Sequence, residues 1–132
     1  MEYLKIKKYL KNNKFNWLIT GVAGFIGSNL LEELLLLNQK VTGIDNFSTG
    51  NIKNLNNVKV LVNNNWKNFK LITGDLSDIK VVKKAINGVD FVLHQAARGS
   101  IPKSTIDPIQ TNKDNVTSFL NILKISKEKK IK

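Results

Sequence analysis

The sequence predicts an α/β fold, a doubly wound parallel sheet truncated after about four strands. Short apolar runs alternate with longer stretches whose apolar residues have helical spacing, and this alternation is typical of a parallel sheet covered by helices. The first apolar run is followed directly by a turn with three glycines that opens a helix. We expect one domain over residues 15–132, preceded by a short helix over residues 1–14.

The first third of the chain predicts a helix, a strand and a second helix. Residues 1–14 are rich in lysine and form an amphipathic pattern. Residues 15–20 make the first strand, and Gly21–Gly27 make the glycine turn. Residues 25–37 continue as a helix, which Asn38 ends. The apolar positions of this helix are Ile26, Leu30, Leu34 and Leu37.

The middle of the chain predicts a second strand and a third helix. Residues 40–44 form the strand, and Asp45 lies at its end. A polar loop over residues 46–50 leads into a helix over about 51–62. Three consecutive asparagines, Asn63–Asn65, end this helix because asparagine favours turns over helix interiors.

The next unit repeats the alternation. Residues 69–73 form the third strand, which Gly74–Asp75 ends. Ser77 can cap the helix that follows over about 78–86, since its hydroxyl can accept a hydrogen bond from the first turn. Gly88 closes that helix.

The last unit is expected to end the sheet. Residues 89–94 are expected to form the fourth strand, and the apolar run over 91–93 is typical of a parallel strand covered on both faces. A loop with Gly99 and Pro102 precedes a last helix over about 107–127. The sequence stops where a fifth strand would normally begin, so we expect the fourth strand to be an exposed apolar edge.

Composition excludes several classes of function. Cysteine is absent, which excludes a thiol nucleophile and a disulfide framework. No apolar run is long enough for a membrane span, and residues 1–14 do not resemble a secretory signal, so we expect a cytoplasmic protein. The net charge is +11, but 20 of the 21 basic residues are scattered lysines. A solvated basic surface is therefore favoured over a nucleic-acid partner.

The glycine turn points to dinucleotide binding. It follows a strand and opens a helix, which is the context that a phosphate-binding turn requires. Gly21 permits the tight turn, Gly24 lets a diphosphate approach the backbone, and Gly27 lets the helix pack close to the strand. The helix N-terminus then offers free N–H groups to the phosphates. Three glycines alone could also be a purely structural turn.

Asp45 adds a second observation. It lies 18 residues after Gly27, at the end of the second strand, where a carboxylate accepts hydrogen bonds from ribose hydroxyls. The same charge would repel a 2′-phosphate, and Asn46 rather than a basic residue follows it. The pair of observations therefore predicts a Rossmann-type domain that binds NAD rather than NADP.

The spacing Gly-x-x-Gly-x-x-Gly within Leu18–Asn29 resembles the extended short-chain dehydrogenases of the NAD-dependent epimerase/dehydratase family. The segments Asp45–Gly50, Gly74–Leu76 and Leu93–Ala97 resemble the parts of that family that contact the cofactor. The resemblance implies NAD contacts at Gly21, Gly24, Phe25, Ile26, Gly27, Asp45, Asn46, Ser48, Thr49, Gly50, Asp75, Leu76, Gln95, Ala96, Ala97 and Asn115.

Within the family, the chain is most similar to bacterial UDP-N-acetylglucosamine 4-epimerases. The helix before the first strand, the long segment 51–68 and the stretch Gly99–Ser104 carry this likeness. It implies a UDP-sugar substrate, with Gly99 and Ser100 bordering the sugar pocket. Arg98 stands where the family pattern has an apolar residue.

The family's chemistry implies residues that this sequence does not contain in the expected place. A tyrosine base, a lysine four residues later and a serine or threonine all lie beyond the fourth strand unit. Tyr3 and Lys7 have the tyrosine–lysine spacing but precede the first strand, so we interpret them as part of a surface helix. His94 is interpreted as structural, and Asp75 and Asp78 as turn and helix-start residues. We therefore expect no catalytic and no metal-binding residue in the chain.

Several functions remain open. The chain could be a fragment of a nucleotide-sugar 4-epimerase that is inactive alone, or of a related dehydratase or decarboxylase. It could instead be a split or regulatory NAD-binding module that pairs with a separate C-terminal chain, or a homo-oligomer. A basic nucleic-acid-binding domain ranks last. We expect neither a nucleic-acid partner nor a membrane partner.

Overall fold

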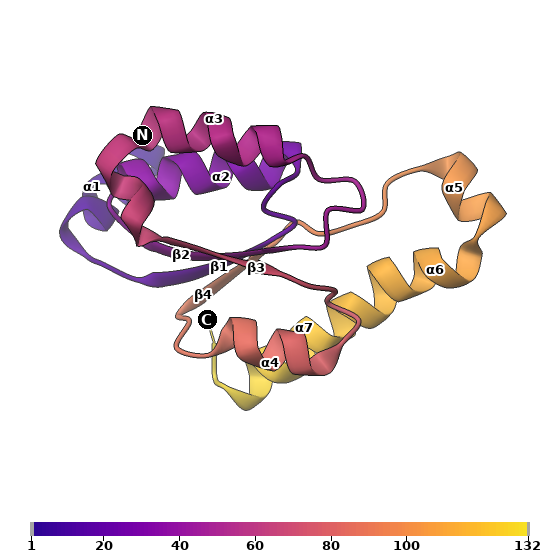
Figure 1. The fold of residues 1–132 in the computed structure, drawn as a ribbon. Coiled ribbons are helices and arrows are strands. Elements are labelled where there is room, and N and C mark those ends of the chain that lie inside the picture. The colour runs from indigo at the N-terminus through magenta and orange to yellow at the C-terminus, as the bar shows by residue number, and fades with distance from the viewer. Residues whose placement is uncertain (1, 132) are drawn as a thin grey trace.

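The computed structural model describes residues 2–131 (Figure 1). The elements follow one another as α1 (Glu2–Asn12), β1 (Asn16–Thr20), α2 (Phe25–Leu36), β2 (Lys40–Asp45), α3 (Ile52–Val62), a 3₁₀ turn (Asn63–Asn68), β3 (Phe69–Thr73), α4 (Ile79–Ile86), β4 (Phe91–His94), α5 (Ile101–Ile106), α6 (Pro108–Asn112), a π-helical turn (Lys113–Thr117) and α7 (Ser118–Glu128).

The four strands form one parallel sheet in the order β3-β2-β1-β4. Ile19 in β1 lies opposite Gly43 in β2 and Leu93 in β4. The chain moves outward from β1 through β2 to β3, and then crosses back to place β4 on the other side of β1. The predicted Rossmann-type α/β fold is confirmed.

Helices cover both faces of the sheet, with α2 and α3 on one side and α4 and α7 on the other (Figure 1). Successive strand residues point to opposite faces, so Leu18 and Ile19 enter two different cores although both are fully buried. Ile19 packs with Leu31 and Leu35 of α2. Leu18 packs in the cluster that contains Val82 of α4, which explains why β1 is apolar on both faces.

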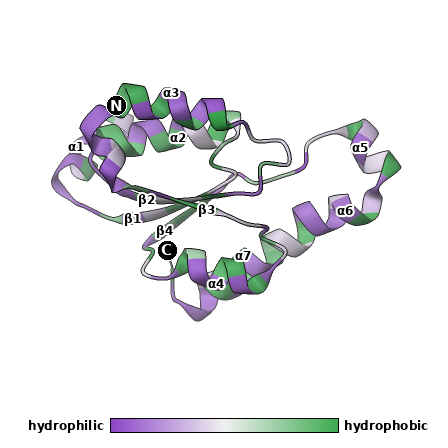
Figure 2. Ribbon diagram, in the orientation of Figure 1, coloured by the Kyte–Doolittle hydropathy of each residue, from purple (hydrophilic) through white to green (hydrophobic). Residues whose placement is uncertain are grey.

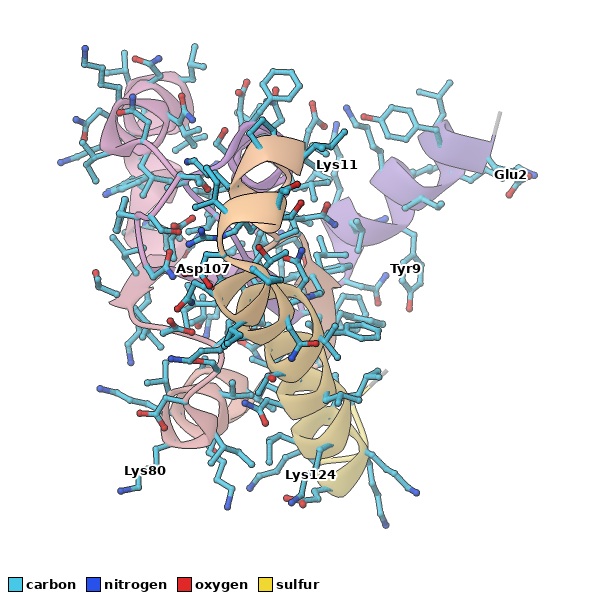
Figure 3. All side chains as sticks on the ribbon, turned by 90° about the vertical axis from the view of Figure 1, so that its right-hand side faces the viewer. Glu2, Tyr9, Lys11, Lys80, Asp107 and Lys124 are labelled. Carbon is cyan, nitrogen blue, oxygen red and sulfur yellow. The ribbon has the colours of Figure 1, made fainter. Side chains whose placement is uncertain are left out.

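The helix α4 shows how sequence pattern sets orientation. Its buried residues are Val82, Ala85 and Ile86, and its lysines are exposed. Figure 2 shows the corresponding change of hydropathy along the helix, and Figure 3 shows Lys80 on its outer side. The apolar spacing of three and four residues therefore directs one stripe of α4 toward the sheet.

The N-terminal helix α1 is held by a buried glutamine, Gln39, which is fully shielded from solvent. Its Oε1 accepts hydrogen bonds from the Phe15 N–H at 3.0 Å and from the Trp17 indole N–H at 3.2 Å. Its Nε2 donates to the backbone carbonyls of Leu10, Asn13 and Leu37. One amide thus joins the end of α1, the start of β1 and the end of α2.

The last third of the chain differs from the prediction. The helix expected over 107–127 is divided into α6, the π-helical turn and α7, and α5 lies where a loop was expected. Both Pro102 and Pro108 fall in the first turn of their helices, where a missing N–H costs nothing. Asp107 ends α5 and caps α6, so the chain changes direction there.

Two further predictions were wrong in detail. The residue that caps α4 is Asp78, whose side chain accepts from the Lys80 N–H, and not Ser77. Ser77 instead donates its N–H to Asp75 within the preceding turn. The fourth strand begins at Phe91 rather than residue 89, and its side chains are only half-buried.

In residues 2–131, no helix is both long and apolar enough to cross a membrane.

Candidate functional site

A cleft lies at the carboxyl ends of the strands, where the strand order reverses between the neighbours β1 and β4. This reversal of strand order is the position at which open parallel sheets bind ligands. The residues that line the cleft are Gly21, Gly24, Ile44, Asp45, Asn46, Ser48, Thr49, Gly50, Gly74, Asp75, Leu76, Gln95, Ala96, Ala97, Arg98, Asp114 and Ser118. Most of them were proposed from the sequence, and the fold brings them together from five separate segments.

The glycine turn needs two of its glycines for the fold. Gly21 has φ of +65°, and a Cβ there would lie 2.8 Å from the backbone of Ala96. A Cβ on Gly27 would overlap the carbonyl oxygen of Gly21. The close approach at Gly27 is therefore made between α2 and the turn itself, whereas the sequence suggested an approach between helix and strand.

Gly24 differs from Gly21 and Gly27, because its backbone angles suit any residue and a Cβ there would make one tight contact rather than an overlap. Its φ is −77°, and within 4 Å a Cβ would meet only the Gly21 carbonyl oxygen, at 3.2 Å. Gly24 lines the cleft and is the N-cap of α2. An added Cβ would therefore need a small shift of the Gly21 carbonyl, and it would add bulk to the wall of the cleft.

The N-terminus of α2 is uncapped and accessible. No side chain caps it, and its first residues, Phe25 and Ile26, are exposed. The first N–H groups of a helix have no intrahelical partners and lie at the positive end of the helix dipole. Such an end binds anions, and phosphate in particular.

Asp45 connects the glycine turn to the loop after β2. It is only 8% exposed, and its Oδ2 accepts a hydrogen bond from the Ala23 N–H at 2.8 Å. Its Oδ1 accepts from the Phe47 N–H at 2.8 Å. A carboxylate has about four acceptor positions, so capacity remains for a ligand hydroxyl in the cleft that Asp45 lines.

The loop after β2 folds back onto the glycine turn. The Asn51 N–H and the Asn54 side chain both donate to the carbonyl of Ala23, at 3.0 and 2.8 Å. A Cβ on Gly50 would lie 2.8 Å from the Asp45 carboxylate, so a larger residue would collide with it. These contacts place Asn46, Ser48, Thr49 and Gly50 along one wall of the cleft.

Asp75 and Leu76 form the wall from the β3–α4 loop. Burial raises the pKa of Asp75, but hydrogen bonds from Ser77 and Asn46 and the nearby charge of Lys113 outweigh it, and the pKa lies below its ordinary value. Asp75 is thus a carboxylate at neutral pH. The Asn121 side chain donates to the carbonyls of Leu76 and Ser77, and this holds the loop against α7.

The end of β4 is held by the hydroxyl of Thr20. Thr20 is fully buried, and its Oγ1 accepts from the N–H groups of Gln95 and Ala96 at 3.0 and 3.1 Å. The same oxygen lies 2.8 Å from His94 Nδ1. Since both lone pairs are used, the hydroxyl hydrogen is available to donate to Nδ1, which favours neutral His94 with its proton on Nε2. Burial lowers the pKa of His94 in the same direction.

Some of the residues proposed from the sequence do not line the cleft. These are Phe25, Ile26, Gly27, Gly99, Ser100 and Asn115. Asn115 instead binds the backbone of Arg98, with its Oδ1 accepting the Arg98 N–H and its Nδ2 donating to the Arg98 carbonyl. Sequence reasoning also missed lining residues: Ile44, Gly74, Arg98, Asp114 and Ser118. Arg98 could have been singled out from the sequence, because it is the only arginine in it.

Tyr3 and Lys7 lie away from the cleft, on α1, which leads into the amino end of β1. The Tyr3 hydroxyl donates to Glu33 at 3.3 Å, and Lys7 pairs with the same carboxylate at 2.7 Å. The hydrogen bond with Lys7 lowers the pKa of Glu33 and raises that of Lys7. Both side chains therefore attach α1 to α2. Figure 3 shows α1, with Glu2, Tyr9 and Lys11, at the side of the molecule.

Comparison with known proteins adds to this geometry. The family described as GDP-mannose 4,6 dehydratase matches residues 18–132. UDP-glucuronic acid decarboxylase 1 of Danio rerio is 34% identical over 129 residues, which is 96% of this chain and 28% of that protein.

Two solved structures share the fold. The UDP-N-acetylglucosamine 4-epimerase of Methanobrevibacter ruminantium M1, in complex with UDP-N-acetylmuramic acid, is 36% identical with a TM-score of 0.77 and covers 91% of this chain and 36% of that one. The UDP-glucose 4-epimerase of Bifidobacterium longum, in complex with NAD+ and UDP, is 30% identical with a TM-score of 0.78, covering 89% and 35%. The chain thus spans about a third of the length of these relatives.

Proposed function

Because this chain belongs to the GDP-mannose 4,6-dehydratase family of NAD-dependent epimerases and dehydratases, we propose that residues 15–132 are the NAD-binding part of a nucleotide-sugar 4-epimerase. The observation that carries the proposal is the contact between Asp45 and the glycine turn, beside the uncapped N-terminus of α2. One small region of the cleft thereby offers N–H donors for a phosphate and a carboxylate for a ribose.

The residues present fit NAD. The backbone at Gly24, which has no side chain, and the first N–H groups of α2, at Phe25, Ile26 and Gly27, would receive the diphosphate. The remaining acceptor positions of Asp45 would bind the adenosine ribose. Residues from the surrounding loops would complete the site: Asn46, Ser48, Thr49, Gly50, Asp75, Leu76, Gln95, Ala96, Ala97 and, through Arg98, Asn115.

The charge at Asp45 favours NAD over NADP. A 2′-phosphate beside this buried carboxylate would place two negative charges together in a shielded environment. Asn46 and Ser48, the polar residues that follow in the loop, carry no positive charge to compensate. We therefore expect weaker binding of NADP than of NAD.

A UDP-N-acetylhexosamine is the proposed substrate of the longer protein. It is supported by the similarity to an epimerase that was solved with UDP-N-acetylmuramic acid. Gly99 and Ser100, which follow the cleft-lining Arg98, would border the sugar. Decarboxylation of a UDP-uronic acid is the second candidate, because a 34% identical relative carries that activity in its name.

We propose that the chain alone does not turn over substrate and pairs with a C-terminal chain or segment that carries a tyrosine base and its lysine. Among residues 2–131, β4 pairs only with β1, so its other edge is free for a further strand. Three isoleucines of α5 and α6 are also strongly exposed: Ile101, Ile106 and Ile109. An isolated edge and apolar side chains of this kind favour a covering partner. Self-association into a homo-oligomer is the alternative way to cover them.

The experiment that tests NAD binding compares two glycine substitutions by calorimetry with NAD and NADP. Gly24→Ala should cost little stability, because φ is −77° and the new Cβ requires only a small shift of the Gly21 carbonyl, but it should weaken NAD binding by about tenfold through steric exclusion of the diphosphate. Gly88→Ala is the matched control. Gly88 has φ of +74° and lies outside the cleft, so this variant should be less stable yet bind NAD unchanged.

Equal affinity of Gly24→Ala and the unmodified chain for NAD would contradict the proposal, and so would tighter binding of NADP than of NAD. Turnover by the chain alone would contradict the proposed need for a second chain. If activity appears when a fragment with the tyrosine and lysine is added, the pairing proposal is supported.

A further inference from the structure

The single arginine of the chain, Arg98, lies at the cleft and is neutralised there by Asp114. Its Nε is 2.6 Å from Asp114 Oδ2, and the two side chains are only 21% and 12% exposed. The other oxygen of Asp114 accepts a hydrogen bond from the Gln110 side chain at 2.6 Å. The chain has 20 lysines and one arginine, and the arginine, whose head is planar and has several donors, forms the least exposed ion pair within residues 2–131.

The ion pair belongs to a larger set of contacts, formed by Arg98, Gln110, Asp114 and Asn115, which we call the Arg98 clamp. The Asn115 side chain binds the Arg98 backbone in both directions, donating at 3.1 Å and accepting at 2.6 Å. The clamp therefore connects the loop after β4 to the helix formed by α6 and α7 through both main chain and side chains.

The helical side of the clamp is irregular. Asp114 and Asn115 lie in the π-helical turn Lys113–Thr117, between α6 and α7. The buried Ser118 hydroxyl donates to the Lys113 carbonyl across this turn, at 3.0 Å. Such single π turns depend on local contacts that compensate the altered backbone bonding, and they occur often at functional sites. The clamp supplies these contacts on the side that faces the cleft.

The Arg98 clamp lies on the side of the cleft where one half of the proposed ligand would bind. Asp45 and Asp75 follow β2 and β3, on one side of the glycine turn, whereas Arg98 follows β4 on the other side. If the first half receives the adenosine and the turn receives the diphosphate, the part of the dinucleotide beyond the diphosphate reaches the β4 side.

We propose that Arg98 and Asp114 are positioning residues that set the β4 side of the cleft for the nicotinamide riboside half of NAD. The inference rests on the proposed NAD binding. Loss of either partner would leave a charge unpaired in a shielded place and remove the side-chain part of the clamp, so the backbone next to Ala97 would be held only by the Thr20 and Asn115 contacts. The grip on the second half of NAD would then weaken, while the ADP half would keep its contacts with Asp45 and the glycine turn.

The test compares ADP with NAD as calorimetric ligands of the same variants. Arg98→Leu and Asp114→Asn should each weaken NAD binding by about tenfold and change ADP binding by less than about twofold. The double variant Arg98→Leu/Asp114→Leu should lose no more than either single one, because the two side chains act as a unit. Lys80→Leu, which removes an exposed charge from α4, is the control and should leave both ligands unaffected.

The ratio of the affinities for NAD and ADP distinguishes a positioning role of Arg98 from a purely electrostatic one. ADP carries more negative charge than NAD, so mere loss of a positive charge would weaken ADP more, which is the reverse of the expected result. Equal weakening of both ligands, or unchanged NAD affinity, would overturn the inference. Failure of the unmodified chain to bind ADP would overturn the proposed function, and the inference with it. If Arg98→Leu does not fold, Arg98→Lys, which keeps the charge without the planar head, serves for the same comparison.

Discussion

The carboxylate of Asp45 accepts a hydrogen bond from the backbone N–H of Ala23 at 2.8 Å, across a separation of 22 residues. This contact joins the end of β2 to the turn between β1 and α2. The second oxygen of Asp45 holds the loop after β2 through the Phe47 N–H. The residue that the sequence suggested as a ligand contact is therefore also a structural link between two walls of the cleft.

Replacement of Asp45 should affect both stability and binding. Asp45→Ala leaves two buried N–H groups without partners and is expected to cost about 1.5–3 kcal/mol in the free energy of unfolding. NAD affinity should fall by about tenfold or more, since the ribose acceptor is lost. Urea unfolding and calorimetry measure the two effects. Asp78→Ala removes the same charge together with a helix cap outside the cleft, and should leave NAD affinity unchanged.

Gln39 should matter for stability although it is far from the proposed ligand. Gln39→Leu removes an amide that binds two N–H donors and three carbonyls within the protein. The expected loss is about 2–4 kcal/mol, because several buried polar groups lose their partner at once. Urea unfolding measures it, with Gln95→Leu as the matched control on an exposed glutamine. Equal urea midpoints for Gln39→Leu and Gln95→Leu would contradict the predicted contribution of Gln39 to stability.

Stability should decrease as the pH falls below the ordinary pKa of histidine, about 6.5. Burial lowers the pKa of His94 in the folded chain, so between the ordinary and the lowered pKa the unfolded state binds a proton that the folded state does not. Unfolding free energy therefore rises with pH in this window and falls as acid is added. The control is His94→Asn. Its side-chain oxygen can accept a hydrogen bond from the Thr20 hydroxyl, and an amide side chain does not titrate.

The measurement is the denaturation midpoint from about pH 7.5 to pH 5.5, where only the unmodified chain should lose stability through this residue. The lowered pKa of Asp75 acts at more acidic pH and does not interfere. A slope that is the same for the unmodified chain and for His94→Asn would show that another group is responsible.

The chain by itself is expected to self-associate. Ile101, Ile106 and Ile109 are each more than 80% exposed, on α5 and α6, which stand clear of the sheet in Figure 1. Ile106→Glu should reduce the associated fraction in light scattering at high concentration without changing stability, since an exposed side chain loses no packing. Val60→Glu, at an equally exposed site on α3, is the control. A monodisperse monomer of the unmodified chain would contradict the prediction.

Local features of the sequence predicted much of the fold. Two residues after helix ends, Asn38 and Gly88, have the positive φ that their types tolerate, 56° and 74°. The apolar strand β1 and the glycine turn after it were also predicted within a few residues. These features depend on neighbours along the chain, so a single sequence contains the information that decides them.

The last third of the chain was less predictable, because part of its structure depends on contacts between segments that are distant in the sequence. Helical spacing over 107–127 predicts the start of the helix at Asp107 and Pro108, but it does not reveal the π turn, whose Asn115 contacts the loop after β4. Earlier in the chain, the sequence offered both Ser77 and Asp78 as side chains able to cap α4, and Asp78 is the residue whose carboxylate accepts the Lys80 N–H.

The sequence by itself determined the parallel α/β architecture, the glycine turn and the acid at the end of β2, because periodicity and turn chemistry act over short stretches of chain. Only the tertiary structure decided which polar groups share a buried partner. Gln39 reaches Leu10 across 29 residues, and Arg98 reaches Asp114 across 16. Such pairs form because burial removes water and each polar atom must then find a partner in space, whatever its position along the chain.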